Sequence, residues 1–249
     1  MLNKLRSIQK IKKDIQWVLK TPVHVLNADT MSFPNLLEIS IEEKDLENLS
    51  KQRKLGYYYE GLIALILQHS DYKIVHQSLQ VIKDGVTKGE ADFIIESPEG
   101  KIIHVEVTCK FYMEYEQEDG SFVFLGPDAR DSLAKKEGKL LNHQLKLDLP
   151  IKVDERCYFM QVVKFKNSIE ALPNRWAYVD EIDLQDTLNW FYLPKLSWLS
   201  GMDGEPVESW EEEKKKILLS QKARQYAVME KGELVNRLLL VSRSWPLNT

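Results

Sequence analysis

What the sequence lacks excludes several classes of protein. It has only two cysteines in 249 residues, Cys109 and Cys157, and they form no zinc-type spacing. We therefore expect buried thiols in a reducing compartment rather than a disulfide framework. No apolar run approaches the roughly 18 residues that a membrane span needs. The N-terminus carries charges where a signal peptide would be apolar, so we expect a cytoplasmic protein with no membrane partner.

The sequence also lacks an excess of positive charge. Its net charge is −4, so any surface that binds nucleic acid must be a local patch. It contains no internal repeat and no glycine-rich loop that could cradle phosphates. With 43% hydrophobic and 29% charged residues, the composition is that of an ordinary globular protein. The length suits one domain, or one domain with an appended subdomain.

The clearest pattern lies in residues 89–111, which read GEADFIIESPEGKIIHVEVTCKF. The runs 91–97 and 101–111 alternate apolar and polar side chains, which predicts two half-buried strands. Residues 98–100 would form a three-residue hairpin loop, with Gly100 free to take a positive φ. In that register Asp92 lies opposite Glu106 on one face. The other face is apolar throughout: Ala91, Phe93, Ile95, Ile103, Val105 and Val107.

Two carboxylates facing each other repel unless something binds between them. A divalent metal is the natural candidate, because Mg²⁺ takes carboxylate oxygens and keeps water and phosphate as its other ligands. The alternative is an exposed sheet face on which Asp92 and Glu106 are simply solvated. The polar positions of the second strand point toward the same place: His104, Glu106, Thr108 and Lys110. His104 is a single histidine, more often structural than ligating, and receives no role.

A helix is predicted over residues 55–69, where Leu55, Tyr59, Leu62 and Ile66 recur at helical spacing. Glu60 lies at the edge of this apolar stripe. A carboxylate there is uncommon unless it is paired or binds a ligand, although a solvent-facing position remains open.

The other predicted elements complete a mixed α/β layout with helices on both faces of the sheet. The pattern favours a basic helix over residues 1–20, a strand over 72–82, and a strand extension or a small extra hairpin over 111–125. A helix over 127–147 would begin at Gly126-Pro127-Asp128, and a strand over 157–166 follows it. Near the C-terminus we expect a long helix over 209–230 and a strand over 238–241. The basic side of the 127–147 helix is a candidate contact for nucleic-acid phosphates, through Arg130, Lys135, Lys136 and Lys139.

Four segments in combination resemble a family of bacterial proteins, domain-of-unknown-function family 1853: LGYYYE (55–60), GEADFIIE (89–96), HVEVTCKFY (104–112) and LGPDARDSLAKKEGKLLNHQL (125–145). The resemblance covers most of the chain from about residue 50, more weakly in the segments after residue 157. That family in turn is similar to the PD-(D/E)XK, or restriction-endonuclease-like, nuclease superfamily, whose core is an αβββαβ unit. On this basis we expect a basic N-terminal helix and connection (1–48), a nuclease core (49–168) and an aromatic-rich extension (169–249).

The resemblance implies a metal-dependent nuclease that hydrolyses phosphodiester bonds of DNA or RNA with Mg²⁺ or Mn²⁺. Carried over residue by residue, it assigns metal binding to Glu60, Asp92 and Glu106, and a catalytic role to these three and Lys110. The superfamily's usual lysine stands two residues after the acid, where this chain has Thr108. An inactive nuclease-like fold that binds nucleic acid or a protein partner is therefore the alternative. The sequence does not decide between DNA and RNA as the substrate, nor between a homodimer and a monomer.

Overall fold

The computed structural model describes residues 2–31, 40–168, 173–182, 189–220, 222–231 and 233–246. The chain divides into two compact units, each made of two stretches. The first unit comprises residues 1–109 and 136–162, and the second comprises residues 110–135 and 163–249. Strands β3 and β5 and helix α4 contribute residues to both units. The predicted boundaries at residues 48 and 168 remain a prediction.

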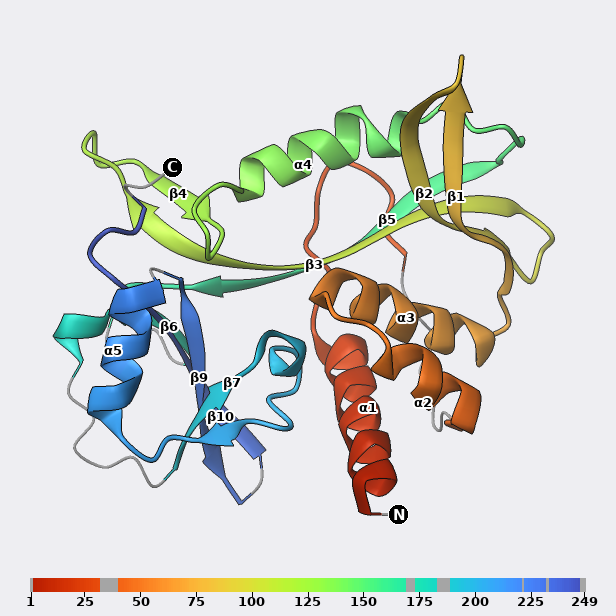
Figure 1. Ribbon diagram of the computed structural model, residues 1–249. Coiled ribbons are helices and arrows are strands. Elements are labelled where there is room, and N and C mark those ends of the chain that lie inside the picture. Colours follow the sequence, from red (N-terminus) through yellow and green to blue (C-terminus); the bar gives the residue numbers. More distant parts are fainter. Residues whose placement is uncertain are drawn as a thin grey trace. The chain divides into compact units, whose positions relative to one another are not determined.

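The first unit is built on a sheet with helices on both faces (Figure 1). Its elements follow the predicted order of helix, three strands, helix and strand, which confirms the mixed α/β class. The sheet runs β1-β2-β3-β4, and β5 pairs with β3; of these strands, β4 belongs to the second unit. The bounds are α1 Leu2–Lys20, α2 Glu43–Ser50, α3 Leu55–Gln68, β1 Lys73–Lys83, β2 Val86–Glu96, β3 Ile102–Glu116, β4 Phe122–Leu125, α4 Leu133–Asn142, a 3-10 turn Gln144–Lys146 and β5 Glu155–Phe165.

The hairpin of β2 and β3 has the predicted register. Phe93 pairs with Val105 and Ile94 pairs with His104, and the strands run antiparallel, as a short hairpin loop requires. The loop is closed by the Ser97 amide, which donates to the Lys101 carbonyl at 2.9 Å, and Gly100 takes a φ of +79°. All six residues of the predicted apolar face are buried.

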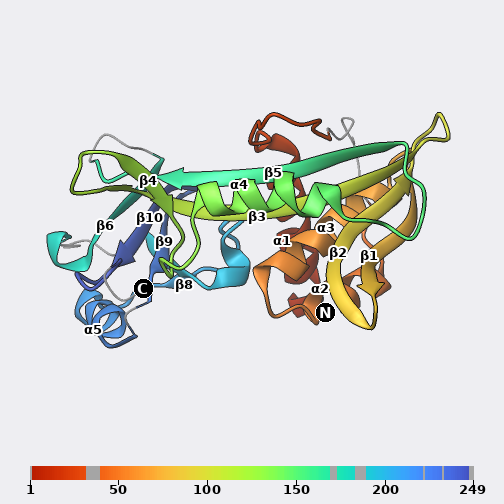
Figure 2. The ribbon, with the colours of Figure 1, turned by 90° about the horizontal axis from the view of Figure 1, so that it is seen from above.

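The prediction that these strands are half-buried is wrong in the middle of the hairpin. Ile94 and His104 are fully buried, and Glu106 is only 1% exposed. The reason is a second covering layer: α3 lies on one side of the sheet, and α4 with the turn after it lies on the other (Figures 1 and 2). The backbone of Gly89 in β2 is so close to this layer that a Cβ there would lie 2.7 Å from Leu147 Cδ2.

Helix α1 packs against α3 along its apolar stripe. Ile11, Ile15 and Val18 are buried, and so is Asp14, the one acid of the helix. The Tyr58 hydroxyl of α3 donates to the Asp14 carboxylate at 2.7 Å, and Lys10 pairs with the same oxygen. The described part of this basic helix therefore docks on the domain. Among the described helices, none is long and apolar enough to cross a membrane.

Helix α4 begins later than predicted, at Leu133 instead of next to Pro127. Residues 126–131 form a turn in which Ala129 takes a φ of +57° and donates its amide to the Gly126 carbonyl. The Asp128 carboxylate accepts from the Arg130 amide at 3.3 Å, an interaction that favours a turn over a helix. Ser132 accepts from the Lys135 amide at 3.3 Å, as an N-cap does, and so starts the helix.

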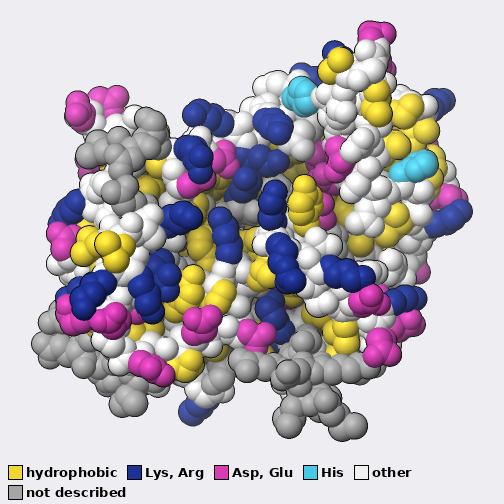
Figure 3. All heavy atoms as spheres, viewed as in Figure 1, with side chains coloured by type: hydrophobic (Ala, Val, Ile, Leu, Met, Phe, Trp, Pro, Cys, Tyr) yellow, Lys and Arg dark blue, Asp and Glu magenta, His cyan; other side chains and the backbone are white. Residues whose placement is uncertain are grey.

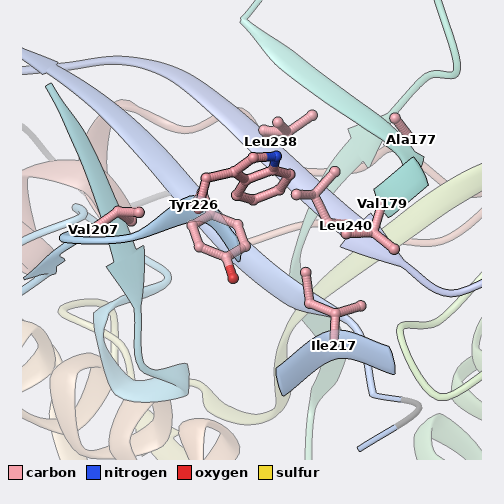
Figure 4. Close-up of a cluster of buried hydrophobic side chains, with 8 residues drawn as sticks. Ala177, Val179, Val207, Ile217, Tyr226, Leu238 and Leu240 are labelled. Carbon is pink, nitrogen blue, oxygen red and sulfur yellow. The ribbon is translucent and has the colours of Figure 1, made fainter. Parts of the chain in front are cut away.

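The second unit contains a sheet with strand order β6-β10-β9-β7-β8, in which β10 is parallel to β6 and antiparallel to β9. The bounds are β6 Asn174–Tyr178, β7 Trp190–Leu193, β8 Glu205–Pro206, α5 Trp210–Ser220, β9 Arg224–Glu230 and β10 Glu233–Val241, with 3-10 turns at Val179–Glu181 and Lys195–Ser197. Tyr226, Leu238 and Leu240 from the sheet pack with Ile217 of α5 in one apolar cluster (Figure 4).

The predicted helix over residues 209–230 is wrong in its second half. Helix α5 ends at Ser220, and residues 224–230 form β9. β9 lies between β10 and β7, so its backbone hydrogen bonds come from strands outside the window that suggested a helix. The predicted strand over 238–241 is confirmed as the end of β10.

Candidate active site

Asp92 forms a hydrogen bond that links the two carboxylate-bearing strands. It is half-buried on β2, and its Oδ2 accepts a hydrogen bond from the Val107 amide of β3 at 2.8 Å. Burial raises the pKa of this carboxyl to about 8, and the nearby charges of Glu106 and Glu60 raise it as well. The hydrogen bond from the Val107 amide and the positive charge of Lys136 lower the pKa of Asp92. A carboxylate at this position therefore carries its charge only at a free-energy cost.

Glu106 is held at both of its oxygens. His104 Nε2 lies 2.8 Å from Oε1, and the Gln144 side-chain amide donates to Oε2. The Lys136 ammonium in turn donates to Gln144 Oε1 at 2.9 Å. A chain of hydrogen bonds thus runs from Lys136 on α4 through Gln144 to Glu106. It fixes the orientation of a side chain that is almost completely buried.

Glu60 lies near enough to Asp92 and Glu106 for their charges to interact. It is half-buried on α3, and burial raises its pKa to about 7, with further contributions from Glu90 and Glu106. The positive charge of Lys136 lowers the pKa of Glu60. The preceding residue, Tyr59, is fully buried and donates its hydroxyl to Gln161 of β5 at 2.8 Å, which fixes this part of the helix. The structure thus brings Glu60, Asp92 and Glu106 within electrostatic reach of one another.

Sequence reasoning missed two members of this cluster and gave a third a different role. Glu90 stands two residues before Asp92, so strand alternation alone could have placed the two carboxylates on the same side of β2. Gln144 follows the end of α4 and has no signal in the sequence. Lys136 was assigned to phosphate contacts, yet it is half-buried and faces the carboxylates through Gln144.

Lys110 belongs to the second unit, where its ammonium pairs with the Asp131 carboxylate at 2.9 Å. The Tyr112 hydroxyl donates to the same Asp131 oxygen at 3.2 Å. In the described part of the chain the acid that pairs with Lys110 is Asp131, not Glu60, Asp92 or Glu106. Thr108, at the position of the superfamily's lysine, is half-buried.

The candidate phosphate contacts do not share one helix face, which corrects the predicted basic side. Arg130 lies in the turn before α4 and pairs with Asp128 at 3.3 Å. Lys135 and Lys139 are exposed on α4, whereas Lys136 is turned inward. On the face shown in Figure 3, Lys and Arg side chains are interspersed with Asp and Glu, in keeping with the net charge of −4. A phosphate contact here would be local.

The donor set fits a hard divalent cation in its chemistry and its charge. Glu60, Asp92 and Glu106 supply carboxylate oxygens, and their mutual repulsion is what a cation relieves. Each oxygen of Glu106 still has a second lone pair beyond its hydrogen bond. As placed, however, no three His, Cys, Asp or Glu side chains of the described residues are grouped so that they could hold a metal ion. Binding would need these carboxylates to turn toward one point.

These features define a mixed α/β protein in whose first unit the carboxylates of Glu60, Asp92 and Glu106 act electrostatically on one another, and the Lys136 ammonium acts on Glu60 and Asp92. The family model described as a domain of unknown function (DUF1853) matches residues 9–155, and the chain belongs to that family. The match begins well before residue 50, so it includes most of α1, and it ends before the segments after residue 157. No curated protein and no solved structure matches the chain.

Proposed function

We propose that this protein is a metal-dependent nuclease that hydrolyses phosphodiester bonds of DNA or RNA. The observation that carries the proposal is that Glu60, Asp92 and Glu106, which come from three different elements, lie near enough for their charges to act on one another. Burial and mutual repulsion raise the pKa of Glu60 to about 7 and that of Asp92 to about 8. Groups shifted this far are typical of functional sites. The order α3-β1-β2-β3-α4-β5, interrupted only by the short strand β4 between β3 and α4, also supports the restriction-endonuclease-like assignment.

Glu60, Asp92 and Glu106 would hold Mg²⁺ or Mn²⁺, which supplies activation of water and charge neutralisation at the phosphoryl group. The chain's own contribution is orientation. The Val107 amide fixes one oxygen of Asp92, and His104 with Gln144 fixes both oxygens of Glu106. The layer above β2 and β3 excludes bulk water, so charges at the site interact more strongly than they would at the surface.

Lys136 takes the role that the superfamily gives to the lysine at the Thr108 position. Its positive charge acts on both Asp92 and Glu60, and Gln144 connects it to Glu106. An ammonium there can stabilise negative charge that develops on the phosphoryl oxygens. Lys110 is the weaker candidate, because its ammonium is engaged by Asp131.

The assignment of the catalytic lysine can be tested by comparing variants of Lys136 and Lys110. Lys136→Met is expected to lower the rate of metal-dependent cleavage at least about tenfold, because it removes the cation beside the carboxylates. Lys110→Met, matched in side-chain shape, is expected to change the rate by less than about threefold, because it removes a half-exposed ion pair with Asp131. Initial rates under identical metal concentrations measure both variants. The reverse order of effects would return the role to Lys110.

The proposal is tested by incubating the protein with duplex DNA, single-stranded DNA and total RNA including tRNA. Each substrate is run with Mg²⁺, with Mn²⁺ and with chelator. We expect cleavage of at least one substrate class with a metal and none with chelator. Cleavage that persists in chelator would contradict a metal-dependent site, and the substrate that is cut decides between DNA and RNA.

An inactive nuclease-like fold is the second candidate. Two observations favour it: Thr108 replaces the usual lysine, and no three metal-ligand side chains of the described residues are grouped around one point. On this alternative the protein binds nucleic acid or a protein partner without turnover. Retained binding of the same substrates with no cleavage under any metal would favour it over the nuclease.

A further inference from the structure

The hairpin of β1 and β2 extends past the point where β2 separates from β3. The register of β2 with β3 runs from Phe93 to Glu96, whereas its register with β1 continues to Val86. The Val107 amide, the next part of β3, bonds to the Asp92 side chain instead of to the backbone of β2. Residues 78–91 therefore form a two-stranded ribbon that turns away from β3 and extends beyond the candidate site (Figure 1).

One face of this ribbon is packed against the rest of the first unit. Val81 is buried, and a Cβ on its pairing partner Gly89 would lie 2.7 Å from Leu147 Cδ2. A two-residue loop closes the ribbon, with Asp84 at a φ of +53° and Gly85 at a φ of +74°, as a type I′ turn requires. An isolated two-stranded ribbon is marginally stable, so the contact with Leu147 helps to hold its position.

The opposite face of the ribbon is a strip that starts at the candidate site and becomes exposed toward the turn. Glu90 stands two residues before Asp92, and Gln80 pairs with Glu90, so alternation places all three on one face. Ile82 follows Gln80 on the same face. Asp92 and Glu90 are half-buried, whereas Gln80 and Ile82 are exposed, and so is Lys88, the extra residue of a β-bulge.

The end of the ribbon combines exposed apolar surface with positive charge. Ile82 is 62% exposed and Val86 is 55% exposed, which is unusual for two large apolar side chains on neighbouring positions of a hairpin. Lys83 and Lys88 outnumber Asp84 in residues 82–88. The Lys83 ammonium lies 3.9 Å from the exposed Asp148 carboxylate, and such an exposed pair contributes little.

Duplex DNA is the partner whose shape and chemistry fit this ribbon. The major groove of B-form DNA admits a two-stranded ribbon, whereas that of duplex RNA is too narrow and deep for side chains to read. Gln80 can hydrogen-bond to base edges, Ile82 can contact a thymine methyl group, and lysines can reach the phosphates beside the groove. A protein interface is the poorer fit, because lysine is depleted in such interfaces. Thr87 lies five residues from Asp92, about 17 Å along an ideal strand, so one duplex can reach both the ribbon and the carboxylates.

We propose that residues 78–91 enter the major groove of duplex DNA, with Gln80 and Ile82 at the base edges and Lys83 and Lys88 at the phosphates. Because the exposed strip begins at Asp92, the assignment rests on the proposed cleavage site and names duplex DNA as its substrate. The part of the DNA bound by the ribbon lies beside the phosphodiester bond that is cut.

Binding is measured by fluorescence anisotropy in the presence of chelator, so that cleavage does not interfere. The probes are a short DNA duplex, an RNA duplex of the same sequence and the DNA single strands. The DNA duplex is expected to bind at least about tenfold more tightly than the RNA duplex, because only its major groove admits the ribbon. Equal or tighter binding of the RNA duplex or of a single strand would overturn the proposal, and so would no binding of any probe.

Two double variants separate phosphate contacts from base contacts. Lys83→Gln with Lys88→Gln is expected to weaken binding of the DNA duplex at least about fivefold. It should also lower the slope of log affinity against log salt concentration by about two, because each lysine at a phosphate releases roughly one counterion. Gln80→Ala with Ile82→Ala is expected to weaken binding at least about fivefold and leave the salt slope unchanged. All four side chains are exposed, so the melting temperature should not change.

Lys44→Gln with Lys215→Gln is the matched control, because it removes the same charge from two exposed lysines of α2 and α5. It should change neither the affinity nor the salt slope, and an effect equal to that of the Lys83 and Lys88 variant would overturn the assignment to the ribbon.

The ribbon and the cleavage activity can fail separately. Weakened DNA binding by both ribbon variants, with no cleavage by the unmodified protein under Mg²⁺ or Mn²⁺, would support the ribbon and contradict the nuclease. Metal-dependent cleavage of duplex DNA with unchanged affinity and rate in both ribbon variants would retain the nuclease and remove the ribbon from substrate binding.

Discussion

Asp92→Asn is expected to lower metal-dependent cleavage at least about 100-fold while raising the melting temperature of the metal-free protein at pH 8. The rate falls because a neutral amide is a poor ligand for a hard cation and no longer balances its charge. The stability rises because the substitution removes a charge that Glu106 and Glu60 oppose. The asparagine oxygen can still accept from the Val107 amide, so the contact between β2 and β3 is kept.

The matched control is Glu96→Gln, which neutralises another carboxylate of the same strand. Glu96 forms a surface pair with Lys73 at 3.3 Å, and its side chain is 39% exposed. Because exposed pairs contribute little, both the cleavage rate and the melting temperature should stay close to those of the unmodified protein. Initial rates and thermal denaturation of the three proteins provide the test. Cleavage by Asp92→Asn at the rate of the Glu96→Gln control would remove Asp92 from the active site.

The opposite signs of these two effects distinguish a functional cluster from a structural one. A carboxylate that serves the fold is stabilising where it stands, and its neutralisation lowers stability. Asp92 and Glu60 are instead held where burial and like charge work against ionisation. Natural proteins violate local rules of this kind mainly at functional sites, where a ligand offsets the unfavourable arrangement.

The hairpin that carries Asp92 and Glu106 could be predicted from the sequence because its determinants are local. Alternation sets which side chains share a face, and the loop ending at Gly100 sets the register. The observed pairing of Ile94 with His104 follows from these two facts alone. The burial of both faces could not be predicted, because the covering layer includes Leu147, which is more than forty positions from Ile94.

Errors in the rest of the fold arose where local signals and tertiary pairing disagree. Pro127 with Asp128 is typical of a helix start, yet the Asp128 carboxylate accepts from the Arg130 amide and stabilises a turn instead. Residues 224–230 follow a run of helix-forming residues, yet they pair with strands on both sides. β-structure depends on such partners more than on the intrinsic preference of its residues.

In the candidate site too, the features set by local sequence could be predicted and those set by tertiary contacts could not. Glu60, Asp92 and Glu106 could be proposed from one helix pattern, one hairpin and a family resemblance. Gln144 and the inward orientation of Lys136 depend on how α4 packs over the sheet, which no short pattern encodes.

The metal-free protein is expected to lose stability as the pH rises from about 4 to about 8. In the unfolded chain Asp92 and Glu60 ionise near their ordinary pKa values of 3.8 and 4.5, whereas in the folded protein these pKa values are raised to about 8 and about 7. The folded state therefore binds more protons in this range, and the free energy of unfolding decreases as the pH increases. Discounted for solvent screening, a loss of about 2 kcal/mol corresponds to a melting temperature lower by about 4–8 °C.

A divalent metal should reverse this loss above pH 7. Mg²⁺ binds the ionised carboxylates of the folded state, so it stabilises that state more as the protons leave. Thermal denaturation between pH 5.5 and 8.5, with Mg²⁺ and with chelator, measures both effects. The double variant Asp92→Asn with Glu60→Gln isolates the contribution of these two groups from every other titration in the protein. Its melting temperature should vary less with pH and should not respond to Mg²⁺, since it retains Glu106 alone of the three proposed ligands. A pH dependence identical to that of the unmodified protein would show that neither burial nor neighbouring carboxylates raise the pKa values of Asp92 and Glu60 in the folded state.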